Sequence, residues 1–346
     1  MAKIGIITFN FTLDNYGQVL QYLATQEYLK KLGHQAILVE SNGWRRTFSR
    51  YIKWSFELIW NFIKIKILHP LFITKKKQKI AIEQKEKEKH FIFEHWASNS
   101  KKQEKGHPRY FNEFRNRFFS IISGTYEDIL EKNFDAFCVG SDQTWAVADN
   151  HWLLAWVPQE AKRFSIAPST GHRKFTESEI KAFIPHLKKF NFITVREENG
   201  IQFCKQCGRY DAIKILDPVF LPQANSYNAF MDNTPTKEEA YVFIYMLGGE
   251  IGLSMNEIFS FCKQHGLKIK YVESQGRDEK FDNKIYATVG EWLRLIKGAS
   301  LVITNSFHGT AFSIIFQKQF LTFPLINLME DMNQRIYDLV EQMKLK

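Results

Sequence analysis

The chain has 346 residues with a formal net charge of +10, and 45% of its residues are hydrophobic while 24% are charged. This composition is too apolar for an intrinsically disordered chain, and the length predicts two domains with large cores. Four cysteines are too few for a disulfide scaffold, and the apolar run 4–9 is too short for a secretion signal, so we expect a cytoplasmic protein.

The N-terminal part of the chain alternates between strand-like and helix-like patterns. A strand at 3–9, an amphipathic helix at 16–32 and a strand at 35–40 form one predicted β-α-β unit. Further apolar strands are predicted at 134–139, 163–167, 192–195 and 213–216. The alternation predicts a Rossmann-like α/β domain over residues 1–221, with a parallel sheet.

The excess positive charge lies in one segment, residues 44–117, which holds 19 Lys and Arg against 7 Asp and Glu, whereas the rest of the chain holds 28 against 30. Charged residues interrupt its apolar stretch 51–72, which excludes a membrane-spanning helix. We expect a helical insertion whose basic face is either solvated or in peripheral contact with the inner face of the cell membrane. No recognition module accompanies the charge, so no nucleic-acid partner is expected.

A second alternating set begins after a polar stretch, 222–240, which we interpret as a linker. The predicted elements are strands at 241–246, 268–272 and 301–304 and helices at 253–265 and 289–297. They indicate a C-terminal Rossmann-like domain over residues 241–346. Two such doubly wound domains would face each other across a cleft, with ligands beyond the carboxyl ends of the strands.

The stretch 301–316 is the most informative, because an apolar strand runs into a polar turn at the start of a helix. Asn305, Ser306 and His308 then lie beside unpaired backbone N–H groups, where anions such as phosphate or carboxylate bind. A histidine there is suited to bind the anion or to act as a general acid, because its pKa lies near neutrality. The alternative is that His308 only caps a backbone group.

The sequence lacks the residues that several common chemistries require. The chain has no glycine-rich dinucleotide fingerprint, no phosphate-binding loop with its lysine and no Asp-x-Asp pair. The pair Cys204-x-x-Cys207 has no second pair to complete a zinc site. No metal site is therefore expected.

Five separated motifs, taken together, resemble those of the polysaccharide pyruvyl transferase family. They occupy residues 14–21, 135–145, 195–197, 216–218 and 304–313. The resemblance implies two domains arranged as in GT-B glycosyltransferases. It also implies an enzyme that needs no cofactor and uses phosphoenolpyruvate as the donor substrate. The pyruvyl group would become a ketal on two hydroxyls of a sugar, in a surface polysaccharide or a lipid-linked oligosaccharide precursor.

The resemblance assigns roles to residues of those motifs. It implies His308 as the general acid, near an anion held by the guanidinium of Arg196 and by N–H donors at the helix start 308–310. It further implies that substrates contact Asn15, Tyr16, Gly17, Ser141, Asp142, Gln143, Asn305, Ser306, Phe307, Gly309 and Thr310.

Each of these assignments has a plain structural alternative. Arg196 could instead form a surface ion pair with Glu197 or Glu198. Asp142 and Gln143 could cap a following helix, and Tyr16 could be a core residue.

The sequence also departs from the family pattern. Relatives commonly have two aromatic residues where residues 165–171 have none, which puts the acceptor side of the pocket in doubt. Distant relatives have an arginine at the position of Ser306, so another Lys or Arg would have to supply that charge. The chain ends soon after Arg335, earlier than expected for a closing C-terminal helix.

Two other functions stay open. One is a GT-B glycosyltransferase that uses a nucleotide-sugar, although the C-terminal half lacks the paired glutamates that many such enzymes use. The other is a non-catalytic relative that serves as a membrane or assembly module.

Overall fold

The computed structural model describes residues 1–9, 15–41, 109–171, 174–232, 239–247, 254–274, 281, 283–325 and 333–345. The predicted basic insertion lies outside these residues except for its last part, 109–117. No helix within the described residues is both long and apolar enough to span a membrane.

The first sheet has five parallel strands in the order β3-β2-β1-β4-β5. Alternate residues of its central strands face opposite sides, and helices cover both sides. Ile6 packs with Tyr22 on one side, whereas Val139 packs with Phe183 and Leu187 on the other. The strands are β1 (Lys3–Ile7), β2 (Gln35–Ser41), β3 (Ile121–Gly124), β4 (Ala136–Val139) and β5 (Lys162–Ser165).

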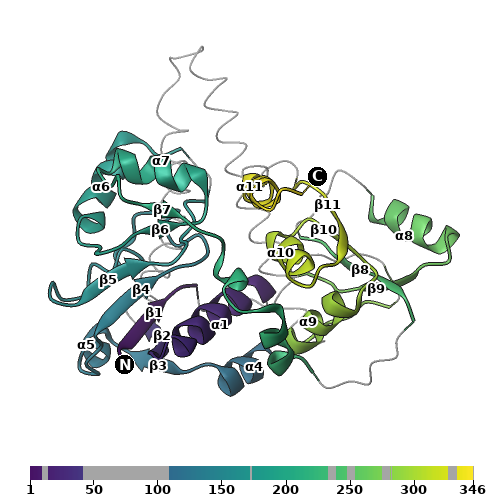
Figure 1. Ribbon diagram of the computed structural model, residues 1–346, viewed down its shortest axis with the longest axis horizontal. Helices are drawn as coiled ribbons and strands as arrows, with labels where there is room; N and C mark the ends of the chain where they lie inside the picture. The colour runs from purple at the N-terminus through teal and green to yellow at the C-terminus, as the bar shows by residue number, and fades with distance from the viewer. Residues whose placement is uncertain are drawn as a thin grey trace, which may run out of the picture.

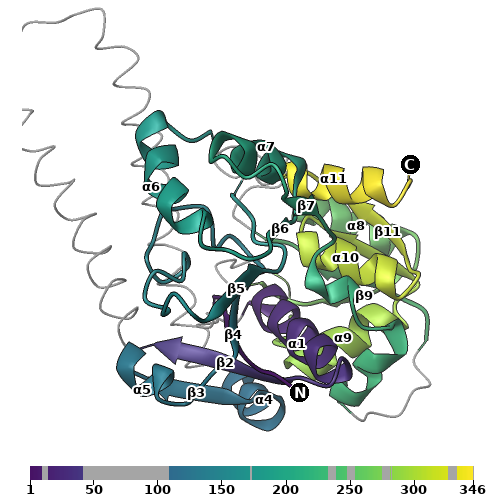
Figure 2. The same cartoon turned by 60° about the vertical axis from the view of Figure 1, so that its left-hand side comes forward.

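A short parallel pair, β6 (Thr194–Val195) and β7 (Ile213–Lys214), continues from β5 through a bridge between Phe164 and Phe192. The second sheet has four parallel strands in the order β11-β10-β8-β9. They are β8 (Tyr241–Tyr245), β9 (Lys268–Tyr271), β10 (Leu301–Thr304) and β11 (Gln319–Thr322). The predicted α/β class, with two parallel sheets in a GT-B-like arrangement, is confirmed, and Figures 1 and 2 show the two sheets in separate halves of the molecule.

The helices surround these sheets. They are α1 (Tyr16–Lys31), α4 (Phe111–Phe118), α5 (Tyr126–Leu130), α6 (Glu177–Leu187), α7 (Glu198–Gln206), α8 (Met255–Gln264), α9 (Val289–Gly298), α10 (Phe307–Ile315) and α11 (Gln334–Gln342). Two 3-10 helices, η1 (Pro218–Phe220) and η2 (Ala224–Phe230), lie in the segment between the sheets. Part of that segment is outside the described residues, and the domain boundaries stay a prediction.

Helix α1 lies between the two halves of the molecule (Figures 1 and 2). One side packs on the first sheet, and the other enters the core of the second sheet. Tyr16 stacks on Trp292 with ring centroids 5.1 Å apart, and its hydroxyl donates to the carbonyl of Ala287 at 2.6 Å. The prediction of an amphipathic helix is wrong, because both faces of α1 are covered and 11 of its 16 residues are buried.

Several elements were not predicted. Strand β3 extends the first sheet, and β11 extends the second. The expectation that the chain ends too early for a closing helix is also wrong. Helix α11 covers α10 with Ile336 and Leu339 in the shared core, and one end of it lies near α7 of the other half in Figure 2.

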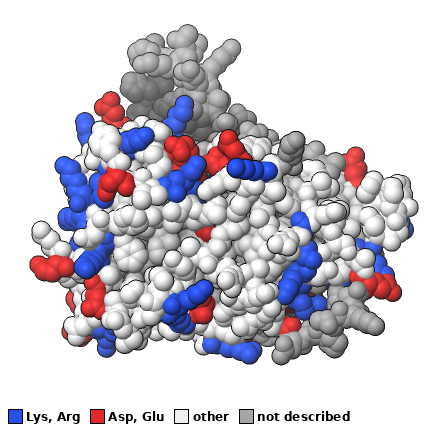
Figure 3. Space-filling view, in the orientation of Figure 1, with Lys and Arg blue, Asp and Glu red and all other residues white. Residues whose placement is uncertain are grey.

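Charge on the described surface is mixed. Blue and red side chains are interspersed toward the margins of the face in Figure 3, and the middle of that face is mostly uncharged. This agrees with the near balance of charge outside residues 44–117.

Candidate active site

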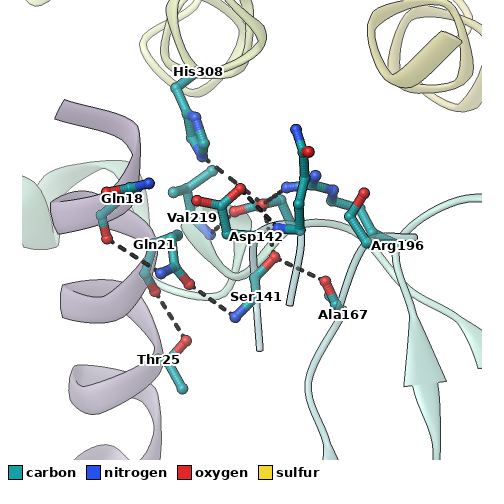
Figure 4. Close-up of polar contacts among 12 residues, drawn as sticks. Gln18, Gln21, Thr25, Ser141, Asp142, Ala167, Arg196, Val219 and His308 are labelled. Atoms are coloured by element: carbon teal, nitrogen blue, oxygen red, sulfur yellow. Dashed lines mark hydrogen bonds and ion pairs between the residues drawn. The ribbon is translucent and has the colours of Figure 1, made fainter. Parts of the chain in front are cut away.

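Both sheets reverse their strand order at one point, between β1 and β4 in the first sheet and between β8 and β10 in the second. Ligands of open parallel sheets bind at such points, beyond the carboxyl ends of the strands. The loops after β4 and β10 carry the predicted residues 141–143 and 305–308. Figure 4 shows that Ser141 and Asp142 of the loop after β4 gather with Arg196 and His308, which come from two other parts of the chain.

Arg196 follows β6 and is buried, with 5% of its surface exposed. Its Nη1 donates to Oδ2 of Asp217 at 2.8 Å, and its Nε donates to Oε1 of Glu197 at 3.4 Å. The pair with Glu197 therefore exists, but it is not the surface pair of the alternative interpretation. Burial alone would lower the pKa of Arg196, yet the neighbouring carboxylates, first of all Glu197, outweigh it and raise that pKa.

Asp217 connects the parts of this site. At the start of η1, its Oδ1 accepts the N–H of Val219 at 3.1 Å. Its Oδ2 accepts from Arg196 and from the hydroxyl of Ser141, and it lies 3.9 Å from Nε2 of His308. Burial alone would raise the pKa of Asp217, but the charges of His308 and Arg196 hold it below its usual value. Sequence analysis missed this role because an Asp-Pro pair also ends extended segments, although the motif 216–218 was a signal.

His308 occupies the second position of α10 and approaches the first helix of the chain. A Cβ atom placed on Gly17 would lie 2.0 Å from Nδ1 of His308, so only glycine allows this contact. Only 13% of the His308 side chain is exposed. Burial lowers the pKa of His308, which Asp217 raises and Arg196 lowers further, so the free imidazole is neutral near pH 7.

The start of α10 is capped from within. Oγ of Ser306 accepts the N–H of Gly309 at 3.2 Å, and the carbonyl of Ser306 accepts the N–H of Thr310 at 2.9 Å. The prediction that Gly309 and Thr310 supply donors is therefore wrong for their N–H groups. A helix leaves its first N–H groups without intrahelical partners, and here these belong to Phe307 and His308.

The loop after β4 is held by α1. Oε1 of Gln21 accepts the N–H of Ser141 at 2.9 Å, and Nε2 of Gln21 donates to Oγ1 of Thr8 at 2.8 Å. Gly140 adopts a φ of +115°, and a Cβ there would lie 2.3 Å from the carbonyl oxygen of Ile166. These contacts place Ser141 against Asp217.

Asp142 and Gln143 extend this loop. The carboxylate of Asp142 accepts the N–H of Gln143 at 2.9 Å and lies close enough to Arg196 and His308 to influence the pKa of each. The capping alternative does not hold, because residues 141–157 are all described and form no helix.

Other predicted residues have structural roles. Both amide atoms of Asn305 bond to the backbone of Leu247, at 2.6 and 2.9 Å. Asn15 caps α1 by accepting the N–H of Gln18 at 3.3 Å. Tyr16 is a core residue, as its alternative interpretation proposed. Their contacts with a substrate stay predictions.

Some buried polar atoms near Asp217 have no hydrogen-bond partner among the described residues. They are Nη2 of Arg196, Nε2 of His308, Oε1 of Gln18 and Oε2 of Glu197. Such atoms cost about 1–3 kcal/mol each when they stay unpaired. Buried polar groups without partners are rare in native proteins and are typical of functional sites.

Other candidate chemistry lacks support in the described residues. No group of three His, Cys, Asp or Glu side chains there could hold a metal ion. Cys204 and Cys207 are buried free thiols, and burial raises the pKa of Cys204 to about 12 and that of Cys207 to about 11. Both therefore stay protonated near neutral pH.

Fold and site together define a class: a two-sheet α/β protein whose buried arginine, histidine and carboxylates meet where both sheets reverse their order. The model of the polysaccharide pyruvyl transferase family matches residues 15–325 of the sequence. The chain belongs to this family.

Solved structures with a similar arrangement include UDP-N-acetylglucosamine 2-epimerase from Rickettsia bellii (TM-score 0.41, 13% identity, 93% of this chain and 79% of that chain covered). The UDP-GlcNAc 2-epimerase from Methanocaldococcus jannaschii has a TM-score of 0.47 at 11% identity, and the match covers 97% of this chain and 92% of that chain. E. coli heptosyltransferase WaaC with ADP has a TM-score of 0.36 at 11% identity, and the match covers 95% of this chain and 89% of that chain. None of the curated proteins matches the chain.

Proposed function

We propose that the protein transfers the pyruvyl group of phosphoenolpyruvate to two hydroxyls of a sugar, as a ketal, in the synthesis of a surface polysaccharide. One observation carries the proposal. Arg196 through Nη1, at 2.8 Å, and His308 through Nε2, at 3.9 Å, both approach Oδ2 of Asp217, while Nη2 of Arg196 and Nε2 of His308 have no hydrogen-bond partner among the described residues. Membership of the family supports the polysaccharide acceptor.

The donor substrate matches these unpaired donors. Phosphoenolpyruvate is a small anion with a phosphate and a carboxylate. In Arg196, two nitrogen atoms already face carboxylates, so Nη2 is the atom left for an anion. A hydrogen bond from a charged group contributes about 1.5–3 kcal/mol. The N–H groups of Phe307 and His308 at the helix start add donors and a partial positive charge.

His308 would supply the proton that the reaction needs. In the free protein, burial and Arg196 keep its pKa low. A bound anion raises the pKa of a nearby imidazole, so donor binding would load His308 with a proton. General acid catalysis of this kind contributes typically about 10²–10⁴-fold to a rate.

The proposed reaction balances without a metal or redox cofactor. The methylene carbon of phosphoenolpyruvate takes a proton from His308, and the oxygen of the first hydroxyl bonds to the neighbouring carbon. The bond from that carbon to the phosphate oxygen breaks, and the second hydroxyl closes the ketal. One hydroxyl proton returns to His308, and the other leaves with phosphate.

The acceptor side is proposed more coarsely. We propose a sugar of a polysaccharide or of its lipid-linked oligosaccharide precursor, reached in the cytoplasm at the inner face of the membrane. The membrane contact predicted for residues 44–117 falls largely outside the described residues. Among residues 165–171, the carbonyl oxygen of Ala167 lies 2.8 Å from the hydroxyl oxygen of Ser141, and the hydroxyl of Ser169 donates to Glu197, so this loop contacts the site through its backbone and a side chain.

Phosphate release from phosphoenolpyruvate, measured with a panel of glycans, tests this function. We expect release with at least one glycan, whose mass grows by one pyruvate less one water. Arg196→Met and His308→Phe should each abolish release while thermal unfolding shows a folded protein. Inertness toward phosphoenolpyruvate with every glycan, together with saturable binding of UDP or GDP, would instead support a nucleotide-sugar transferase.

A further inference from the structure

A second arginine lies beside the site, on the last helix of the chain. Arg335 belongs to the first turn of α11 and is 7% exposed. Its guanidinium carbon lies 5.9 Å from the ring centroid of Phe307, and that of Arg196 lies 4.9 Å from the same centroid. The two guanidinium groups therefore approach one aromatic ring, which directly precedes His308 in α10.

The position of Arg335 follows from the packing of α11. Ile336 and Leu339 bury the apolar side of this helix in the core that α10 shares. One end of the helix lies near α7, which begins two residues after Arg196 (Figure 2). A side chain at the start of α11 thus reaches the place where the two halves meet.

The guanidinium of Arg335 lies among the charged groups that surround Arg196. Burial first and the positive charge of Arg196 second lower the pKa of Arg335, and nearby carboxylates, among them Glu197, oppose the change, so that the pKa is about 10. Arg335 is therefore charged at neutral pH and electrostatically coupled to the same groups that surround Arg196. A buried charge is costly, and proteins retain it where a counter-charge or ligand uses it.

One arginine is not enough for a donor with two anionic groups. Arg196 already faces Asp217 and Glu197, which leaves one unpaired nitrogen for a ligand. We propose that Arg335 binds one of the two anionic groups of phosphoenolpyruvate, phosphate or carboxylate, while Arg196 and the start of α10 bind the other. This inference rests on the proposed function and adds α11 to the donor-binding site. The planar guanidinium suits either group, because it can donate two parallel hydrogen bonds to two oxygens.

Binding of phosphoenolpyruvate by isothermal titration calorimetry tests this inference without an acceptor. For Arg335→Met we expect the dissociation constant to rise by about 10- to 100-fold, the loss of one charge-assisted contact. Arg335→Lys keeps a charge but loses the planar fork, and we expect a rise of at least several-fold. Titrations with inorganic phosphate and with pyruvate identify the group that Arg335 binds. If that group is the phosphate, Arg335→Met should weaken the binding of inorganic phosphate more than that of pyruvate, and if it is the carboxylate, the reverse.

Arg163→Met provides a matched control. Arg163 is also buried, at 2% exposure, and it donates to backbone carbonyls such as that of Pro158 on the first half of the molecule. Its loss should lower the melting temperature and leave the affinity for phosphoenolpyruvate unchanged.

The outcomes separate this inference from the proposed function. If wild-type protein does not bind phosphoenolpyruvate, the proposed function fails. If wild-type protein binds it and Arg335→Met binds equally well, Arg335 only stabilises the fold and the inference is overturned. Where Arg335→Met does not fold, unchanged affinity in Arg335→Lys overturns it as well.

Discussion

Gly17 lies so close to His308 that an alanine there would displace the imidazole. The added Cβ would be 2.0 Å from Nδ1 and 2.6 Å from Cε1 of the ring. Ordinary contacts begin near 3.5 Å, so the ring must retreat by roughly 1.5 Å. That movement takes Nε2 away from its place 3.9 Å from Asp217.

The size of the effect can be estimated for both stability and rate. Overpacking costs about 1–3 kcal/mol, whereas alanine gains about 1 kcal/mol over glycine in a helix, so Gly17→Ala should lose about 0–2 kcal/mol of stability. A catalytic group displaced by about 1 Å can lower a rate by about 10²-fold. We therefore expect a folded protein whose phosphate release from phosphoenolpyruvate is about 10²-fold slower.

Gly298→Ala is the matched control for this variant. Gly298 is also a helical glycine packed against a side chain, because a Cβ atom there would lie 2.6 Å from the hydroxyl oxygen of Tyr241. Tyr241 begins β8, at the end of the strand opposite to the site. Gly298→Ala should lose stability and keep its rate. A wild-type rate in folded Gly17→Ala, or an equal loss of rate in both variants, would refute the reasoning.

Three further predictions concern pH and packing. Because the general acid must be protonated and burial lowers the pKa of His308, kcat/KM for phosphoenolpyruvate should fall as pH rises through a value below 6.5, and a flat profile would contradict this. Asp217 raises that pKa, so Asp217→Asn should move the fall to lower pH, whereas the exposed Asp211→Asn should not. His151 is buried, and burial lowers its pKa to about 3. As pH falls below 6.5, the imidazole of His151 therefore takes up a proton in the unfolded chain before it does so in the folded protein. Stability should then be lost by about 1.4 kcal/mol per pH unit between pH 6.5 and 3, and His151→Phe should flatten urea-unfolding midpoints measured across that range. Equal slopes in both proteins would exclude His151 as the cause.

The strands of both sheets could be predicted because their patterns are local. β1, β4, β8 and β10 are apolar runs, and the bounds of each differ from the predicted bounds by at most two residues. Helix α1 shows the limit of such patterns. Its periodicity predicts one apolar face, but the second sheet packs on the other face, and no local pattern reports a contact with residues more than 250 positions away.

Some residues of the candidate site could be predicted from sequence motifs, and others could not. Motif positions brought Arg196 and His308 to attention, and the structure places both beside one carboxylate. That carboxylate, Asp217, was overlooked because a residue that organises others through buried contacts looks like an ordinary turn residue in sequence. Arg335 was overlooked because only the packing of α11 over α10 brings it to Phe307.

The binding of phosphoenolpyruvate to wild-type protein, to two site variants and to one control variant tests the central claim most directly. Calorimetric titration should show saturable binding to wild-type protein and to Arg209→Met, whose arginine pairs with Asp211 away from the site. Arg196→Met and His308→Phe should each bind at least about 10-fold more weakly, because each removes one donor to the same anion. Wild-type protein that fails to bind, or unchanged affinity in either of these two variants, would contradict the account.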